Sequence, residues 1–484
     1  YMVLRLEFSR IDTATHESTY RGFWLNTLSA ARRFTGAYRN LFTEEQRGII
    51  EGGKGPEEIL KHIFDFTRQN NLPYKIYVLI DEYDHFANEL LSFDMNRFKS
   101  DVSRNGFVRK FYESLKTAAG EGVVDRIFIT GVSPVTLDSL TSGFNISSHI
   151  TTNVLFHDML GFRQEEVEEL LRKYDIEEDG IRDMMDDLRD WYDGYVFEPD
   201  ARASLYNPDM VLYFLLQYGI KRTYPEVMLD INVVSDYRKI RNIFRIGGLE
   251  SERLQLLNRL VTEGFIDFKL TQLFNLEGEF TNEDFLSLLF YMGMLSFKDR
   301  RLMLWRFRIP NYVIKMLYFE YFTMIQLVHT RYSTDRYAIA EAINMLLSEG
   351  DGESFFRVVE HVLKEHHSNR DDLTYNEKHI QTLVIGLLSP YDAYYIHSEY
   401  ETGRGYADIF LERLPGRGLP YDVVLELKYV KKSEKSKAAG VAKGAVEQLS
   451  GYMGTARFAR PDVRGLYAVF VGHTLYKWGE VKGS

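Results

Sequence analysis

Apolar runs of strand length alternate with longer helical stretches at both ends of this 484-residue chain, and this order restricts the fold more than any other feature. The N-terminal strand-like runs span residues 2–8, 75–80 and 124–130, and the helical stretches between them span residues 22–39 and 56–69. Strands that alternate with helices favour a parallel sheet with helices on both faces. Residues 1–160 are therefore predicted to form a parallel α/β core.

The remainder of the chain is expected to form a helical middle and a second α/β domain. Residues 161–330 are predicted to be mostly helical and to end in a helix and two short strands, an order that resembles a winged helix. That helix and its strands span residues 285–294, 295–298 and 303–309. Residues 331–370 are predicted to be a helical connector, and residues 371–484 to be α/β. The order predicted there is helix, three strands, helix and strand, at residues 375–388, 393–400, 406–411, 422–429, 438–453 and 465–472.

The composition excludes several classes of protein. The chain has no cysteine, which rules out disulfides, thiol catalysis and cysteine-bound zinc and fits a reducing cytoplasm. No apolar run reaches the roughly 18 residues of a membrane helix, and no signal-peptide pattern occurs. The formal net charge of −11 argues against a protein that simply coats nucleic acid, although a local basic groove can still hold phosphates. We therefore expect a cytoplasmic protein without a membrane-spanning segment.

Three charged residues occupy two predicted strands that are otherwise strongly apolar. Asp408 lies within Gly405–Phe410, and Glu426 and Lys428 lie within Val423–Lys428. Side chains alternate along a strand, so Glu426 and Lys428 share one face. A charge inside so apolar a strand is costly unless it is paired, metal-bound or exposed. The three residues are therefore candidates for a common site.

Two carboxylates on adjacent strands can hold Mg²⁺ or Mn²⁺, which are hard cations that prefer oxygen ligands. Such an ion lowers the pKa of a bound water and offsets the negative charge that builds up on a phosphate. A lysine two residues further on can orient or deprotonate that water and stabilise the transition state. Asp408, Glu426 and Lys428 are thus typical of chemistry that cuts a phosphodiester bond. Taken alone, a Glu-x-Lys pair on a strand is more often a solvated face.

Asp408 and Glu426-Leu-Lys428 match the signature of the PD-(D/E)XK nuclease superfamily, which the chain resembles over roughly residues 371–475. The predicted order of helices and strands also matches the core of that superfamily. The resemblance implies that Asp408 and Glu426 hold the metal ion and that Lys428 acts on the water. The same fold can also be kept for binding alone.

Three further residues strengthen this resemblance. Glu377 occupies the place of the acidic residue in the first helix of the superfamily core. Gln448 and Tyr452 match the Gln-x-x-x-Tyr motif of the exonuclease branch, and a spacing of four residues places both on one helix face. The resemblance implies that these three side chains support the metal, the water or the substrate.

A lysine-rich segment begins at the same strand. Residues 428–437 contain five lysines and one glutamate. The segment can hold a nucleic-acid backbone, and a flexible solvated loop explains the same composition equally well. The sequence leaves both interpretations open.

A second acidic motif follows the strand-like run Lys75–Ile80. Asp81 and Glu82 come directly after it, and a parallel sheet places such residues at its carboxyl edge, where nucleotides bind. The motif resembles the Walker B pattern of P-loop ATPases, which implies that Asp81 positions Mg²⁺ and Glu82 polarises the attacking water. By the same resemblance, Thr130 and Ser133 after the next strand are candidates to sense the γ-phosphate of ATP. Without that resemblance, the two acids would be a strand-end pair that caps a helix.

Taken together, the two ends resemble an AAA-ATPase-like family of bacteria and archaea whose members carry a PD-(D/E)XK domain. The segments that support this resemblance are Asp81–Asp84, Thr130–Ser133, Phe156–Phe162, Trp191–Tyr195 and Tyr206–Pro208. For Trp191–Tyr195, we favour a plainer interpretation as a helix end with packed aromatic side chains and Gly194 in a left-handed cap.

The phosphate-binding loop of such ATPases, Gly-x-x-x-x-Gly-Lys-Ser/Thr, does not occur in the sequence. The nearest segment, Gly52–Gly55, lacks the spacing and the hydroxyl group and follows no strand. The strand at 2–8 would be the second strand of such a sheet, so we expect the first strand and the loop to precede Tyr1. The chain by itself is therefore expected to bind ATP poorly or not at all.

These features together predict a Mg²⁺-dependent nuclease that ATP regulates in the complete protein, with DNA favoured over RNA as its substrate. The resemblance implies mobile-element or defence biology and leaves a homo-oligomer open. Two alternatives also remain: a non-cleaving nucleic-acid-binding ATPase switch, and an ATP-dependent protein-interaction switch. The intact Asp408, Glu426 and Lys428 favour cleavage, because a protein that only binds phosphates has no need of two unpaired carboxylates beside them.

Overall fold

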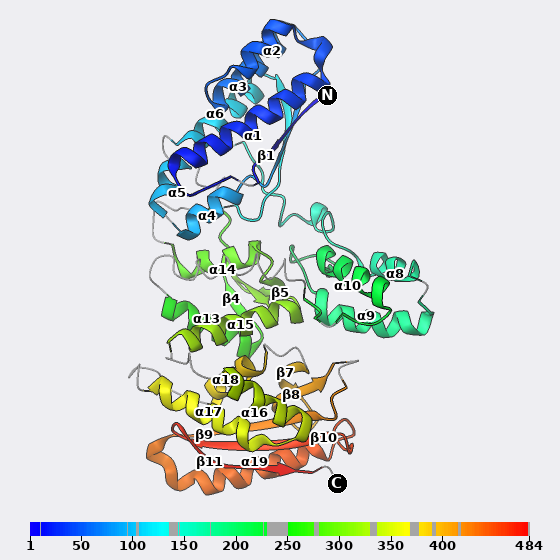
Figure 1. The fold of residues 1–484 in the computed structure, drawn as a ribbon, viewed down its shortest axis with the longest axis vertical. Helices are drawn as coiled ribbons and strands as arrows, with labels where there is room; N and C mark the ends of the chain where they lie inside the picture. The colour runs from blue at the N-terminus through cyan, green and yellow to red at the C-terminus, as the bar shows by residue number, and fades with distance from the viewer. Residues whose placement is uncertain are drawn as a thin grey trace.

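In the computed structural model, three tiers follow one another along the long axis of the molecule, with the N-terminal domain at one end and the C-terminal sheet at the other (Figure 1). A lobe of three helices projects from the middle tier: α8 (Gln164–Arg172), α9 (Glu178–Tyr192) and α10 (Pro208–Lys221). The structure describes all residues except 10, 94, 103–105, 135–143, 145, 175, 226, 230–249, 275–279, 330–335, 368–376, 390–393, 415–417 and 483–484. No helix in the described ranges is long and apolar enough to cross a membrane.

The N-terminal domain is built on three parallel strands in the order β1 (Met2–Glu7), β2 (Ile76–Asp81) and β3 (Val124–Ile129). The predicted strands and their parallel arrangement are confirmed. Helix α1 (His16–Ala37) packs on β1, α6 (Phe107–Gly120) packs on β3, and α3 (Pro56–Gln69) contacts both helices. The shorter helices here are α2 (Glu44–Glu51), α4 (His85–Phe93) and α5 (Met95–Asp101).

Within the described residues, helices cover one face of this sheet, whereas the sequence led us to expect helices on both. Leu4 and Leu6 of β1 are fully buried, but the intervening Arg5 is exposed, and so is Val3, at 42%. This alternation is typical of a strand with one covered face. Apolar and polar residues alternate from Leu4 to Glu7 in the sequence, which agrees with one covered face.

The middle tier contains the predicted helix followed by a hairpin. Helix α14 (Asn282–Tyr291) precedes β5 (Ser296–Arg301) and β6 (Leu304–Arg308), which pair antiparallel. A further short strand, β4 (Ile266–Phe268), pairs with β6 and gives a sheet of order β4-β6-β5. The flanking helices are α13 (Glu250–Glu263) and α15 (Tyr312–His329). The helix and hairpin match the predicted helix and two strands, whereas the third strand, β4, was not predicted.

The C-terminal domain has the predicted order of elements plus one additional strand. These elements are α18 (Glu377–Leu388), β7 (Tyr394–Glu401), β8 (Tyr406–Arg413), β9 (Asp422–Val430), α19 (Ala438–Met453), β10 (Val463–Val471) and β11 (Thr474–Val481). The sheet order is β11-β10-β9-β8-β7, in which β9 and β10 are parallel and the other neighbours are antiparallel. The additional strand β11 is a largely exposed edge strand, so its sequence lacks the apolar run of the others.

Hydrophobic cores lie on both faces of this sheet. Leu425 and Leu427 of β9 belong to the core that contains α18, whereas Val424 belongs to a second core under α19. The predicted connector forms α16 (Arg336–Glu349) and α17 (Gly352–His367), and α17 packs against β10 and β11. The sheet is therefore held between α17 and α18 on one side and α19 on the other (Figure 1).

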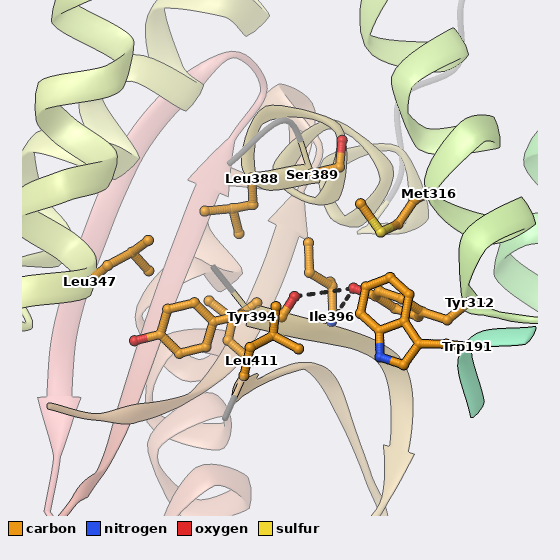
Figure 2. A pocket seen from close by; sticks show the side chains of 10 residues that line it. Trp191, Tyr312, Met316, Leu347, Leu388, Ser389, Tyr394, Ile396 and Leu411 are labelled. Atoms are coloured by element: carbon orange, nitrogen blue, oxygen red, sulfur yellow. Dashed lines mark hydrogen bonds between the residues drawn. The ribbon is translucent and has the colours of Figure 1, made fainter. Parts of the chain in front are cut away.

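An aromatic cluster joins the helical lobe to the C-terminal sheet, and Figure 2 shows two of its side chains, Trp191 and Tyr312. The Trp191 indole N–H, at the end of α9, donates a hydrogen bond to the Tyr395 hydroxyl on β7, and both rings pack against Tyr312 of α15. The Tyr312 hydroxyl in turn accepts from the Ile396 N–H at 2.6 Å. Gly194 follows with a φ of 101°, and a Cβ there would lie 2.0 Å from a backbone oxygen. The interpretation of this segment as packed aromatic side chains beside a left-handed glycine agrees with the structure.

Candidate active site

In the C-terminal domain, the Lys428 ammonium lies among three carboxylates. Its Nζ atom is 2.8 Å from Glu426 Oε1, 3.0 Å from Glu377 Oε1 and 4.0 Å from Asp408 Oδ2. Asp408 and Glu426 are buried, whereas Glu377 at the start of α18 is partly exposed. The structure thus brings together four residues that the sequence distributes over one helix and two strands.

The register of β8 and β9 explains why Asp408 and Glu426 meet. The strands pair antiparallel, and their ladder ends with Ile409 opposite Leu425, so Asp408 and Glu426 each lie one residue beyond the last pair. The backbone ladder ends at this point, and the Leu427 N–H donates to Asp408 Oδ2 at 2.6 Å. A carboxylate therefore takes the place of a backbone acceptor where the two strands separate.

Gln381 is a further member of the cluster, although the strand motif gives no reason to select it. Its Nε2 atom donates to Asp408 Oδ1 at 2.7 Å, and only 5% of the residue is exposed. Gln381 follows Glu377 by one helical turn, so α18 directs both toward the strands. The amide of Gln381 and the N–H of Leu427 together fix the orientation of the Asp408 carboxylate. The sequence signal for Gln381 is weak, because it is one of several polar residues in the first half of α18.

Burial and mutual repulsion disfavour the charged forms of the two buried acids. Burial, with the neighbouring Glu426, raises the pKa of Asp408 to about 7, although Lys428 opposes this rise. Burial also raises the pKa of Glu426. Burial alone would lower the pKa of Lys428, but Asp408 and Glu426 raise it overall, so the ammonium stays charged. The cluster therefore favours an added positive charge.

The donors in this cluster fit a divalent cation. They are carboxylate oxygens, and Glu426 Oε2 is a buried acceptor without a hydrogen-bond partner among the described residues. One ammonium cannot balance three carboxylates, so an additional cation would reduce their repulsion. Within the described ranges, no three His, Asp or Glu side chains are placed to bind one ion together. The fit of this site to a divalent cation therefore rests on the carboxylates of Asp408 and Glu426. The Glu377 carboxylate contacts the Lys428 ammonium instead.

In the N-terminal domain, the carboxyl ends of the strands bring three of the predicted residues to one edge of the sheet. Asp81 Oδ1 accepts a hydrogen bond from Thr130 Oγ1 at 2.7 Å, which links the ends of β2 and β3. The other oxygen of Asp81 lies 3.7 Å from an Arg5 nitrogen on β1. Glu82 is exposed and has a φ of 49°, a left-handed conformation that is uncommon for residues other than glycine. This edge therefore carries an acid pair and a hydroxyl group, as predicted.

Ser133 is instead a buried residue of a loop that Asp84 closes. The Asp84 carboxylate accepts the N–H groups of Val132, at 3.1 Å, and Ser133, at 2.7 Å, and the Asn88 amide at 2.7 Å. Burial raises the pKa of Asp84, and these hydrogen bonds oppose the rise. Gly131 allows this closure, because a Cβ there would lie 2.3 Å from Asp84 Oδ1. The Ser133 hydroxyl, bonded to Asn88, thus belongs to the loop structure in this conformation.

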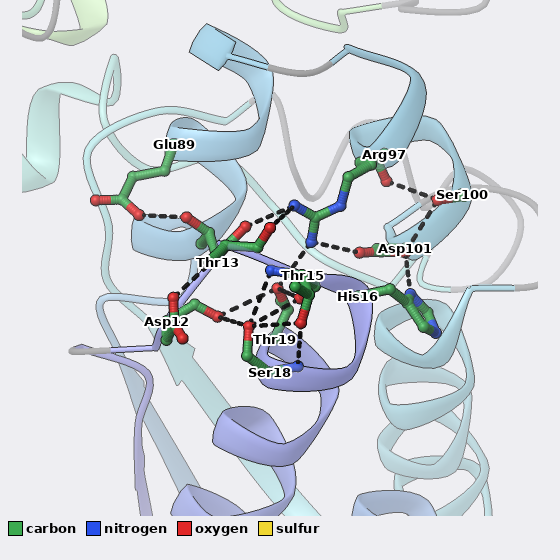
Figure 3. A network of polar contacts seen from close by, with 11 residues as sticks. Asp12, Thr13, Thr15, His16, Ser18, Thr19, Glu89, Arg97, Ser100 and Asp101 are labelled. Carbon is green, nitrogen blue, oxygen red and sulfur yellow. Dashed lines mark hydrogen bonds and ion pairs between the residues drawn. The ribbon is translucent and has the colours of Figure 1, made fainter.

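A polar network fixes the segment between β1 and α1 beside this edge (Figure 3). Thr15 caps α1 by accepting the N–H of Ser18 at 3.0 Å. The Asp101 carboxylate at the end of α5 is fully buried and bonds His16 Nδ1 at 2.6 Å. Arg97 donates to the Thr13 carbonyl oxygen at 2.6 Å. These bonds anchor the start of α1 to α5 and so hold the β1–α1 segment in place.

Comparison with known families gives one match at each end of the chain. Residues 1–141 match the family described as a predicted AAA-ATPase, and residues 375–476 match the PD-(D/E)XK nuclease superfamily. The chain joins an AAA-ATPase-like domain to a PD-(D/E)XK nuclease-superfamily domain. No curated protein matches the chain. The second match spans the whole carboxylate–lysine cluster, and the first spans Asp81 and Thr130.

In the PD-(D/E)XK domain, the two residues of the predicted α19 motif have different surroundings. Tyr452 is buried, and its hydroxyl donates to the Tyr406 carbonyl oxygen at 3.0 Å, at the start of the strand that carries Asp408. Burial raises the pKa of Tyr452, and the nearby Glu426 and Asp408 raise it further. Gln448 lies one turn earlier and is exposed. The structure thus places Tyr452 beside the cluster and Gln448 at the surface.

Replacing Gln381 by methionine is expected to weaken the response of this domain to Mg²⁺. The variant keeps the side-chain volume but loses the donor that orients Asp408. Loss of an outer partner of a metal ligand costs about 10- to 100-fold in metal affinity or activity. The measurement is cleavage rate against Mg²⁺ concentration. Thr382→Val is the matched control, because Thr382 is the buried next residue of α18 and bonds Asn258 instead. Equal effects of the two substitutions would contradict this role of Gln381.

Proposed function

We propose that the C-terminal domain is a Mg²⁺- or Mn²⁺-dependent nuclease that hydrolyses phosphodiester bonds in DNA. The observation that carries this proposal is the buried cluster in which Lys428 Nζ lies 2.8 Å from Glu426 and 3.0 Å from Glu377. The cluster combines oxygen ligands with a fixed ammonium group. It lies in a domain of the PD-(D/E)XK nuclease superfamily, whose members generally use divalent metal ions.

Each side chain of the cluster has a separate task in this proposal. Asp408 and Glu426 would hold the ion, which lowers the pKa of a bound water and offsets charge on the phosphate. Lys428 donates hydrogen bonds to the water or to the phosphate oxygens. Because its pKa is raised, Lys428 orients and stabilises charge and does not serve as the base. Glu377 holds the ammonium in place, while Tyr452 and Gln448 support the strand or the substrate.

The lysine-rich segment supports a nucleic-acid substrate. It continues from β9 as a 3-10 helix, η6 (Lys432–Lys437), which leads into α19. The four lysines that follow β9, at positions 431, 432, 435 and 437, are exposed. An ordered group of exposed ammonium groups next to the cluster suits a phosphate backbone better than a loop without structure would. We therefore assign this segment to backbone binding.

ATP is proposed to regulate the nuclease through the AAA-ATPase-like domain. The hydrogen bond between Asp81 and Thr130 supports this, because it places a Mg²⁺-binding type of acid and a hydroxyl group at the carboxyl edge of a parallel sheet. Glu82 is proposed to position the attacking water. Since the sequence contains no phosphate-binding loop motif, this chain alone is expected to bind ATP weakly.

The proposal is tested by incubating the chain with labelled single- and double-stranded DNA and RNA in Mg²⁺, Mn²⁺ or EDTA. We expect fragments from DNA with either metal ion and none in EDTA. Metal-dependent cutting of RNA alone would replace DNA by RNA in the proposal.

Absence of cutting on every substrate, with and without ATP, would leave the two non-enzymatic alternatives. They differ in how the protein behaves on immobilised nucleic acid. A nucleic-acid-binding switch would be retained and released as salt rises, because counterion release makes phosphate binding steeply salt-dependent. A protein-interaction switch would pass through the column at low salt.

A further inference from the structure

An exposed tyrosine begins the strand that carries Asp408. Tyr406 is the first residue of β8 and is 59% exposed. It precedes Asp408 by two residues, and the two-residue period of a strand directs both side chains to the same face. A large aromatic ring is thus presented to solvent beside the carboxylate cluster.

The hairpin before Tyr406 fixes the backbone from which this ring projects. Glu401 and Tyr406 close the β7–β8 ladder. Inside the turn, the Thr402 N–H and hydroxyl group both donate to the Gly405 carbonyl oxygen at 2.8 Å. Gly405 has a φ of 134°, a conformation that suits glycine. The turn is therefore ordered by its own hydrogen bonds.

A hydrogen bond from α19 also holds the backbone at Tyr406. The Tyr452 hydroxyl, on α19, donates to the Tyr406 carbonyl oxygen at 3.0 Å. Arg404, at the tip of the hairpin, is exposed two residues before Tyr406. An aromatic ring and a guanidinium group on a pre-ordered hairpin can bind without a large cost of ordering.

We propose that Tyr406 stacks on an unpaired base of the substrate strand beside the phosphate that is cut, while Arg404 binds the backbone. This proposal rests on the proposed nuclease function and names its substrate class as a single strand or a frayed strand end. Aromatic side chains stack on any base, and arginine adds attraction to the phosphate or the ring. Within an intact duplex both faces of a base are already stacked, so Tyr406 would have no face to contact.

The test measures binding separately from cutting. Fluorescence anisotropy follows a labelled oligo(dT) strand and a labelled blunt duplex in Ca²⁺, for the wild-type chain, Tyr406→Ala and Tyr406→Phe. Tyr406→Ala is expected to weaken single-strand binding by about 5- to 100-fold, and Tyr406→Phe to keep most of it, because stacking needs the ring and not the hydroxyl. Tyr476→Ala is the matched control, since Tyr476 is a 43% exposed tyrosine on β11, at the edge of the sheet opposite β7.

The outcomes separate this proposal from the nuclease proposal. Single-strand binding that Tyr406→Ala weakens, and that Tyr476→Ala leaves unchanged, supports stacking. Equal binding by Tyr406→Ala and the wild type would overturn the stacking role, and the nuclease proposal would stand if the wild type still cuts. A wild type that binds the duplex more tightly than the single strand would also overturn it. A wild type that neither binds nor cuts any strand would overturn both.

Discussion

Lys428→Ala is expected to lower the rate of DNA cleavage by about 10²- to 10³-fold, the effect of losing one fixed donor to the reacting phosphate. The ammonium group lies 2.8 Å from Glu426 and is held from the other side by Glu377. Removing it leaves the carboxylates in place, so metal binding should persist while cutting is lost. Single-turnover cleavage in saturating Mg²⁺ measures this effect.

Two further variants make the result specific to the site. Lys428→Arg keeps the charge but not the compact donor geometry, and it is expected to recover only part of the rate. Lys173→Ala removes an exposed lysine of the helical lobe that pairs with Glu169, and it should cut at the wild-type rate. Cleavage by Lys428→Ala within a few-fold of wild type would show that another part of the chain, or a contaminant, cuts the DNA.

Trp191→Ala is expected to lower the free energy of unfolding by about 3–5 kcal/mol, the range for truncating a buried tryptophan. Trp191 is 1% exposed, contacts the rings of Tyr312 and Tyr395, and donates its indole N–H across to β7. The substitution leaves a cavity at the junction of the lobe and the C-terminal sheet and removes the donor to the Tyr395 hydroxyl. Urea unfolding followed by far-UV circular dichroism measures the loss.

Trp191→Phe separates packing from hydrogen bonding in the same place. Phenylalanine keeps an aromatic ring but has no donor, so we expect a smaller loss of about 1–2 kcal/mol. An unfolding transition of Trp191→Ala that coincides with that of the wild type would show that the lobe and the sheet unfold independently of this contact.

The strand motif of the C-terminal domain could be predicted because its information is local. The alternation of side chains puts Glu426 and Lys428 on one face, and the antiparallel pairing with β8 brings Asp408 to the same end of the ladder. The predicted elements of this domain are present, and so is their order. Burial raises the pKa of Asp408, and this burial results from packing on both faces of the sheet. The sequences of the two strands alone do not predict it.

The contributions of the helices could not be predicted to the same degree. Gln381 reaches Asp408 only because α18 crosses the strands at one particular place, and helix periodicity does not specify that place. Helix periodicity also does not predict that Tyr452 contacts β8 while Gln448, one turn away on the same helix, is exposed. The motif spacing describes a shared helix face but not how deeply each position is buried.

In the N-terminal domain, two hydroxyl residues near the end of one strand have different surroundings for a local reason. Thr130 is adjacent to β3 and bonds Asp81 across to β2. Ser133 lies beyond Gly131, where the chain turns inward and closes on Asp84. The sequence shows both hydroxyl groups at strand-end positions, and only the close approach at Gly131 distinguishes them.

Isothermal titration of Mn²⁺ into the wild-type chain and into Glu426→Gln measures the metal site itself and requires no knowledge of the substrate. We expect a Mn²⁺ site in the wild type that is lost in Glu426→Gln. We also expect the wild-type affinity to fall as the pH is lowered through about 7, since protons then compete for Asp408. Identical Mn²⁺ binding by both proteins would contradict the assignment of Asp408 and Glu426 as the metal-holding pair.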